Sequence, residues 1–257
     1  MHDLICLTVR TGRRRREKLS PPCPTHPGAR IFRGDQLLYA GRMSETPLLL
    51  LASQSPARAK LLRDSGVGFT QLTSHVDEEA VTLASGATEP GEIALSLARA
   101  KCEAVAALPQ AKGRLVIGCD SVFAFNGEVH GKPLTPERAT ERISAMRGRT
   151  GHLHTGHWLI DTRAPEAGGT GFAGGLEAGA DVTFTHMSDD DVAAYVATGE
   201  PLWVAGSFTL DGYGAAFIER VDGDLHAVIG LSVNGLRILA DQAGVGLGEL
   251  WEPQPRL

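Results

Sequence analysis

Short apolar segments that suit buried strands alternate along this chain with segments that carry helix-start signals. The first pair is the apolar run Leu48–Ala52 followed by Ser55-Pro56, which places a capping hydroxyl and a proline where helices commonly begin. A longer helix is expected over 90–108, because its apolar residues recur on one helical face. This alternation is typical of α/β proteins, and we predict a mixed sheet flanked by helices.

The same signals locate the remaining elements. Apolar, β-rich runs predict strands at 69–73, 115–119, 121–125, 153–161, 181–186 and 217–221. Capping residues and apolar stripes predict further helices at 135–148, 188–199 and 231–242. Asn126-Gly127 predicts a hairpin turn. The glycine-rich stretch 163–180 offers few side chains for packing, and we expect a flexible surface loop there.

Residues 1–42 differ in composition from the rest of the chain. They hold nine Lys or Arg and three acids, a charge of +6, so the remaining residues carry −11. An arginine run and several prolines occur there without helical or strand periodicity. We expect either a disordered extension or an upstream start-codon assignment, with Met43 as the working start, and a globular domain over 43–257. An organelle-targeting peptide is the alternative for the extension.

Charge and hydropathy exclude several classes of protein. The acidic body argues against broad nucleic-acid binding, since contacts with phosphates need a positive face. No apolar run approaches the ~20 residues of a membrane-spanning helix. The four cysteines lack the paired spacing of a zinc ribbon or a disulfide framework. We therefore expect a cytoplasmic protein without a nucleic-acid or membrane partner.

A candidate anion site follows the first strand. Free backbone N–H groups at the start of a helix favour anions, and Ser53, Ser55 and Arg58 would add further donors. A plain helix cap with a surface arginine is the alternative.

Further polar candidates flank the apolar strand 115–119. Asp120 follows this strand directly, where α/β proteins place ligands, and its carboxylate could hold Mg²⁺ or orient a water; a turn aspartate is the alternative. Lys132 stands between a glycine and a proline that fix its backbone, outside any Walker A loop. Lys101 borders the apolar stripe of the helix 90–108, and it either extends to solvent or points into a cleft.

Three histidines lie close together in the sequence, at His152, His154 and His157. Only His152 and His154 would share one face of a strand, and no nearby cysteine or carboxylate completes a ligand set. The sequence therefore disfavours a metal site at these histidines.

Taken together, the motifs resemble the Maf family, also called septum-formation-inhibitor-like proteins, which are nucleotide pyrophosphatases. The order and spacing of the motifs agree from about Leu48 to Ala240. The matching motifs are Leu51–Arg58, Val76–Glu78, Leu97–Lys101, Gly118–Val122, Gly131–Pro133, Tyr195–Pro201, Ala205–Phe208 and Val228–Leu231.

This resemblance implies a two-lobed α/β fold around a central cleft, similar to that of inosine triphosphate pyrophosphatases. It also implies a homodimer that requires a divalent metal cation, Mg²⁺ or Mn²⁺. The implied activity is hydrolysis of nucleoside triphosphates, including non-canonical or modified ones, to the monophosphate and pyrophosphate.

The resemblance also implies roles for individual residues. Asp120 would be the catalytic acid or base and a metal ligand, and Glu78 would help to hold the metal at the catalytic centre. Lys132 would act on the phosphates as a catalytic residue. The remaining substrate-binding residues would be Ser53, Ser55, Arg58, Lys101, Ser121 and Asp211.

The chain departs from the commonest family pattern at four positions. Ala57 stands where the first of two adjacent arginines is usual, and Ser121 replaces a frequent threonine. Asp211 replaces a frequent glutamine, and Ser232 replaces the proline of a final Gly-Leu-Pro. The lost arginine favours a rival function, a non-catalytic nucleotide-binding regulator of cell division. The retained acidic and basic candidates favour the enzyme.

Removal of residues 1–42 should leave the melting temperature and the release of pyrophosphate unchanged, because this segment has no apolar pattern with which to dock. Thermal melts and activity assays of the full and shortened chains measure both. A melting temperature lowered by more than about 5 °C would show that the segment packs on the body.

Overall fold

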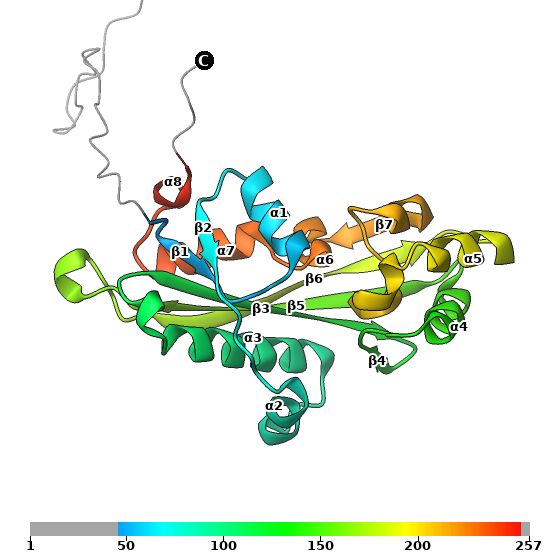
Figure 1. Cartoon of the computed structure of the whole chain (residues 1–257), viewed down its shortest axis with the longest axis horizontal. Helices are drawn as coiled ribbons and strands as arrows, with labels where there is room; N and C mark the ends of the chain where they lie inside the picture. Colours follow the sequence, from blue (N-terminus) through cyan, green and yellow to red (C-terminus); the bar gives the residue numbers. More distant parts are fainter. Residues whose placement is uncertain (1–45, 253–257) are drawn as a thin grey trace, which may run out of the picture. The chain divides into compact units, whose positions relative to one another are not determined.

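One seven-stranded sheet carries the fold, with strand order β2-β1-β3-β5-β6-β7 and with β4 paired to β3. A computed structural model describes residues 46–252, so the predicted extension over 1–42 lies outside the described residues. The strands β2, β1 and β3 run parallel, whereas β3, β5, β6 and β7 pair antiparallel, which confirms an α/β fold with a mixed sheet (Figure 1). The strands are β1 (Leu49–Leu51), β2 (Phe69–Gln71), β3 (Leu115–Phe125), β4 (Glu128–His130), β5 (Thr150–Asp161), β6 (Ala173–Phe184) and β7 (Ile218–Gly223).

Five predicted helices form close to their expected positions because each has a local start signal. Ser55 and Thr135, for example, each accept a hydrogen bond from a backbone N–H three residues later, and a proline follows each of them. These five are α1 (Pro56–Asp64), α3 (Pro90–Ala106), α4 (Pro136–Met146), α5 (Asp189–Ala197) and α7 (Val233–Gln242). The sequence-based prediction missed three short helices, α2 (Glu78–Ser85), α6 (Leu225–Ile229) and α8 (Leu247–Leu250).

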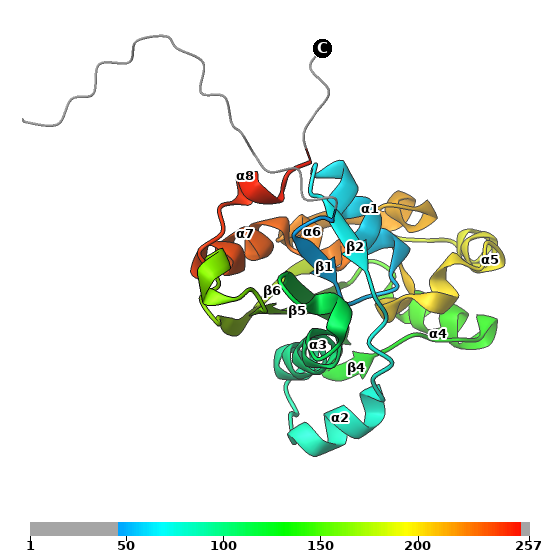
Figure 2. The same ribbon diagram turned by 60° about the vertical axis from the view of Figure 1, so that its left-hand side comes forward.

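Helix α3 covers one face of the sheet, with α2 beyond it, and α1, α6 and α7 cover the other face (Figure 2). The close approach of α3 depends on two glycines in the strands beneath it. A Cβ at Gly118 would lie 2.3 Å from the Ala98 carbonyl oxygen, and one at Gly156 would lie 2.4 Å from that of Ala94. Any side chain at either position would therefore push the helix off the sheet.

Two hydrophobic clusters share the α1 and α7 face at opposite ends of the long strands. One packs β1 and the first half of β3 against α1 and α7, and includes Leu51, Ile117 and Leu236. The other packs the second half of β3 against α4 and α5, and includes Phe123 and Phe184. This division produces the two lobes that the family resemblance implied.

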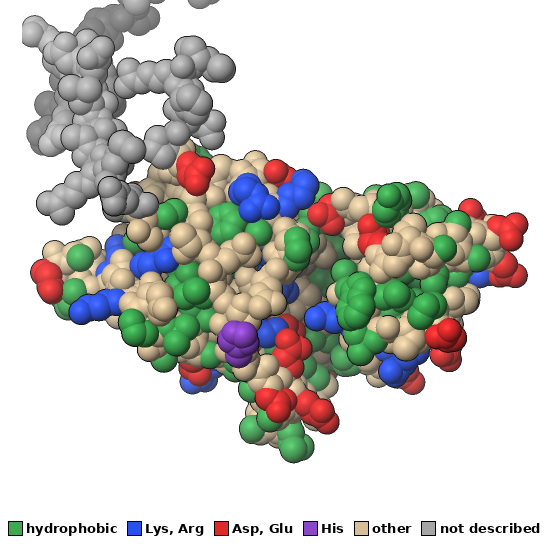
Figure 3. All heavy atoms as spheres, viewed as in Figure 1, with side chains coloured by type: hydrophobic (Ala, Val, Ile, Leu, Met, Phe, Trp, Pro, Cys, Tyr) green, Lys and Arg blue, Asp and Glu red, His purple; other side chains and the backbone are tan. Residues whose placement is uncertain are grey.

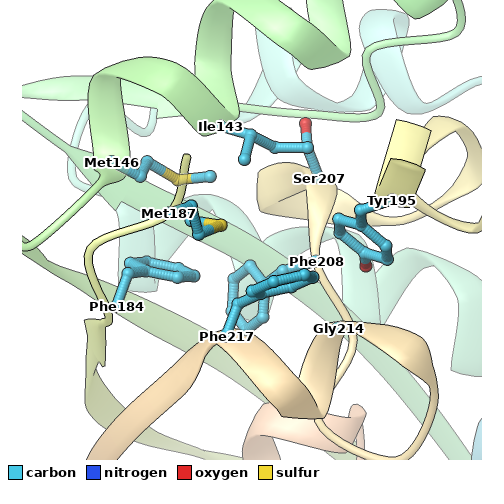
Figure 4. A pocket seen from close by; sticks show the side chains of 9 residues that line it. All are labelled: Ile143, Met146, Phe184, Met187, Tyr195, Ser207, Phe208, Gly214 and Phe217. Atoms are coloured by element: carbon cyan, nitrogen blue, oxygen red, sulfur yellow. The ribbon is translucent and has the colours of Figure 1, made fainter. Parts of the chain in front are cut away.

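A small internal gap of about 10 Å³ lies within the second of these clusters (Figure 4). Its wall is largely apolar, with Phe184, Phe208 and Phe217 packed around it. A gap of this size could hold about one water molecule at most, so it is a packing defect rather than a ligand site.

The prediction of a flexible loop at 163–180 is wrong for the second half of this range. Residues from Ala173 onward belong to β6, whose register with β5 runs from Ala173↔Ile160 to Thr183↔Thr150. The small residues of this segment show no recognisable strand pattern in the sequence. Gly175 must nevertheless be a glycine for the strands to pack, because a Cβ there would lie 2.4 Å from the Trp158 ring. The remaining connection over 162–172 contains a 3₁₀ helix (Pro165–Ala167), and Asp161 accepts hydrogen bonds from the backbone N–H groups of Arg163 and Thr170 across it.

Within 46–252, no helix combines the length and the apolar character that membrane crossing requires. In the same range Cys102 and Cys119 are buried free thiols.

Replacement of Asp161 by alanine should lower the free energy of unfolding by about 2–3 kcal/mol at pH 7. Burial alone would raise the pKa of Asp161, but the Arg163 side chain and two backbone N–H groups lower it to about 2. A lowered pKa means that the carboxylate stabilises the folded state fully above about pH 4 and loses this effect as the pH falls through 2. Urea unfolding between pH 2 and 7 measures the difference between the variant and the parent chain.

Glu166→Ala is the matched control for Asp161→Ala, because Glu166 is an exposed acid in the same connection. It should change stability by less than about 0.5 kcal/mol. An Asp161→Ala variant as stable as this control at pH 7 would contradict the anchoring role.

Candidate active site

The candidate site lies where β3 has no strand partner along one of its edges. Along this edge of β3, pairing with β1 ends at Leu51↔Ile117. Pairing with β4 on the same edge does not start until Phe123↔His130. No described strand covers that edge over 118–122, while β5 continues unbroken along the other edge. Asp120 is at the centre of this open segment.

The prediction that Asp120 follows the end of a strand is therefore wrong. Strand β3 runs from Leu115 to Phe125 without a break, because its antiparallel pairing with β5 supports the backbone on both sides of Asp120. The carboxylate points toward α3, as does the neighbouring position Gly118. The turn predicted at Asn126-Gly127 is confirmed, and both residues have positive φ.

On the α3 side, two carboxylates converge on one ammonium group. Lys101 Nζ lies 2.5 Å from Asp120 Oδ1 and 2.7 Å from Glu78 Oε1. The Lys101 side chain is only 12% exposed, so of the two alternatives for this lysine the structure selects the cleft. Glu78 reaches the group because it is the first residue of α2, which Asp77 caps.

The two carboxylates have shifted pKa values of opposite direction. Burial raises the pKa of Asp120, and the nearby charges of Lys101 and Arg58 offset this only in part. Burial also raises the pKa of Glu78, but Lys101 outweighs it, with a smaller contribution from Lys132, and the net pKa is lowered. A pair of acids separated in this way suits two different tasks, one as proton acceptor and one as a permanent anion.

On the opposite face of β3, Arg58 gathers the residues of the candidate anion site. Its Nη1 donates to Ser53 Oγ at 3.2 Å and its Nη2 donates to Ser121 Oγ at 3.1 Å. Its Nε donates to the Gly230 carbonyl oxygen at 2.6 Å. The guanidinium is thus held at the open segment of β3, so the alternative of a surface arginine is wrong. The alternative of a plain helix cap does apply to Ser55, which caps α1.

The cavity of about 470 Å³ at this site has a volume typical of small-molecule sites. Asp120, Ser121 and Val122 of β3 form one wall, and residues of α2, α3 and β4 form the others. Figure 3 shows the surface hollowed in this region, with basic and acidic side chains at its margin. Ser121 links the two polar groups, since it lines the cavity and accepts from Arg58.

Two predicted residues differ in their relation to the cavity. Lys132 is exposed next to the lining residue Gly131, close enough for its charge to lower the pKa of Glu78. Asp211 is also exposed, but it is not among the lining residues, and its charge acts on Lys60 of α1. The structure therefore brings Lys132 to the site and leaves Asp211 outside it.

Two supporting residues were missed in the sequence. The Thr155 hydroxyl donates to the Ala227 carbonyl oxygen at 2.8 Å and therefore accepts from the Ser121 hydroxyl, also at 2.8 Å. Gly230, with φ of 126°, presents its carbonyl oxygen to Arg58 in a conformation that other residues rarely adopt. The pairing of β3 with β5 brings Thr155 to the site, and no local pattern marks this residue. Gly230 belongs to the family motif Val228–Leu231, but the sequence assigned it no role of its own.

Ser232, which departs from the usual proline, has a structural role of its own. Its backbone N–H donates to His157 Nε2 at 2.7 Å, a bond that proline cannot make. Its hydroxyl accepts from the Gly235 N–H and so caps α7.

Known proteins are similar to this chain over most of its length. The family model described as Maf-like protein matches residues 48–243. A nucleoside triphosphate pyrophosphatase of Streptomyces coelicolor is 52% identical, over 80% of this chain and 95% of the relative. Proteins of the same name from Streptomyces avermitilis and Nostoc punctiforme are 48% and 41% identical, over 81% and 80% of this chain and 96% and 98% of the relatives. The resemblance inferred from the motifs is thereby confirmed, and the chain belongs to the Maf family.

Proposed function

We propose that this protein hydrolyses nucleoside triphosphates to the monophosphate and pyrophosphate in the cleft beside the open edge of β3. The observation that carries this proposal is the convergence of Asp120, Glu78 and Lys101 at the cavity. The names of the similar proteins support the same reaction.

The carboxylates of Asp120 and Glu78 fit a divalent cation. Both lie within 2.7 Å of one nitrogen, the Lys101 ammonium, so the two side chains are already arranged around a single positive charge. Carboxylate oxygens are the donors that Mg²⁺ and Mn²⁺ prefer. When bound, such a cation would neutralise charge on the phosphate oxygens.

The phosphates would be bound by groups from both faces of the strand. Arg58 offers its guanidinium beside the Ser53 and Ser121 hydroxyls, and the start of α1 adds the positive end of a helix. Lys101 and the exposed Lys132 would supply further positive charge from the α3 side. Ala57, where a second arginine is usual, leaves Arg58 as the cation of this segment.

Asp120 would accept the proton of the attacking water. The water oxygen forms a bond to the α-phosphorus, the bond from that phosphorus to the bridging oxygen breaks, and pyrophosphate leaves. A carboxylate with a raised pKa is a stronger base than an ordinary aspartate, and the unpaired strand edge gives it access to the cavity. Glu78, with its lowered pKa, remains an anion throughout.

One assay distinguishes the proposed hydrolysis from the rival function, which is nucleotide binding without turnover. The purified chain is incubated with a panel of common and modified nucleoside triphosphates and with Mg²⁺ or Mn²⁺, and pyrophosphate and monophosphate are measured. Equal amounts of the two products support the enzyme. Nucleotide binding without either product would favour the regulator. The preferred nucleotide, a homodimer and a cytoplasmic location remain predictions.

Asp120→Asn should fold normally and lose activity by roughly 10² or more, because the nearly isosteric amide cannot accept the proton. In the parent enzyme, kcat/KM should fall as the pH drops through the pKa of Asp120, which lies above that of an ordinary aspartate. Steady-state kinetics from pH 4 to 8 measure both effects. Asp222→Asn, at an exposed acid of β7, is the matched control and should behave as the parent. Near-normal turnover of Asp120→Asn would remove this residue from catalysis.

Asp211→Gln should leave the ranking of nucleotides by kcat/KM unchanged, because Asp211 does not line the cavity. An ionised carboxylate only accepts hydrogen bonds, whereas a glutamine also donates to the carbonyl groups of thymine and uracil. The measurement is kcat/KM for four or more nucleotides in both proteins. A change of roughly tenfold or more toward thymidine or uridine triphosphate would instead show that the side chain at this position reaches the base.

A further inference from the structure

The second group of metal-ligand side chains lies on β5 and β6. His152 and His154 lie on one face of β5, and Glu177 comes from β6. Each of the three offers a ligand atom, and these atoms all lie within 4.8 Å of one another. The sequence offered no carboxylate near the histidines, but antiparallel pairing brings Glu177 beside His154, with 3.0 Å between His154 Nδ1 and Glu177 Oε1.

Two glycines leave space for an ion at this cluster. Gly179 is directly opposite His154 in the register of β5 and β6, and a Cβ there would lie 2.8 Å from His152 Nε2 and 3.1 Å from Glu177 Oε1. Gly91, at the start of α3, would place a Cβ 3.4 Å from His154 Nδ1. The donors therefore face a space that side chains at these two positions would fill.

A second carboxylate orients one of the imidazole rings. Asp181 Oδ1 lies 2.6 Å from His152 Nδ1, so the Nε2 atom of the ring is directed toward Gly179. A carboxylate hydrogen-bonded to the far nitrogen of a histidine ligand is a recurrent feature of metal sites, where it sets the tautomer and the orientation of the ring.

We propose that His152, His154 and Glu177 bind a divalent transition-metal ion of the zinc class. Two imidazoles and one carboxylate form a three-ligand set that leaves a fourth position open for water. Imidazole nitrogens favour Zn²⁺ and related ions over Mg²⁺, in contrast to the all-oxygen pair at the cleft.

This site is separate from the catalytic cleft. Asp120 pairs with Gly156, which pairs in turn with Glu177, so the two acids are two strand spacings apart, about 10 Å. The backbone of α3 crosses the sheet between them, because Gly156 contacts the Ala94 carbonyl group. An ion at the histidines would link β5 to β6 beside the start of α3.

The test is a calorimetric titration of the full chain with Zn²⁺ after removal of bound metals by chelation. The parent protein should bind one more equivalent of Zn²⁺ than His154→Ala, and Glu177→Gln should weaken that equivalent at least tenfold. Asp181→Asn should weaken it about tenfold without changing the stoichiometry. Zn²⁺ bound elsewhere in the chain contributes equally to the parent and to the variants, so it does not affect the difference in the number of equivalents.

Two controls locate the ion. His186→Ala removes an exposed histidine outside the cluster and should bind Zn²⁺ as the parent does. Asp120→Asn alters the proposed cation pair of the catalytic cleft, and in this background His154→Ala should still remove one equivalent. Unchanged binding in both His154→Ala and Glu177→Gln would overturn the proposal, as would an Asp120→Asn background in which His154→Ala removes no equivalent. Circular dichroism verifies that each variant is folded, and since binding is the readout, the result is independent of the proposed reaction.

Discussion

The interruption of strand pairing along one edge of β3 is the constraint on which the site depends. Successive side chains of a strand point to opposite faces, so Asp120 and Ser121 belong to different layers of the fold. A partner strand along this edge would keep the two layers apart. Because β1 ends early and β4 begins late, groups from both faces have access to the same open segment.

Each layer contributes a different kind of group to this segment. Helix α3 supplies the largely buried Lys101, which holds together the buried carboxylate of Asp120 and the more exposed one of Glu78. The layer of α1 and α6 supplies Arg58, bound to a carbonyl group and to two hydroxyls. The cations on both faces compensate the acidic charge of the body locally, which is what a polyanionic ligand requires of an acidic protein.

The close packing of α3 on glycines also has a consequence away from the cleft. Small residues in β3, β5 and β6 let the helix backbone lie against the sheet, and the same scarcity of side chains leaves space at Gly179. The helix thus separates an all-oxygen pair of acids from a cluster with two imidazoles. Two sites of different ligand chemistry can therefore lie on one face of one sheet without competing for the same ion.

The sequence by itself determined the elements that depend on near neighbours. Capping residues and prolines located α1 and α4, Asn126-Gly127 located the hairpin, and the ordered motifs identified the family. The motifs also contain most of the residues that the structure brings to the cleft. Only the tertiary structure decided that Asp120 lies within a strand, that residues from Ala173 onward form β6, and that Glu177 joins the histidines. The physical reason is that caps, turns and periodicity act over a few residues, whereas strand register and ion pairs join groups far apart in the chain. No local pattern specifies which distant segment will provide the partner.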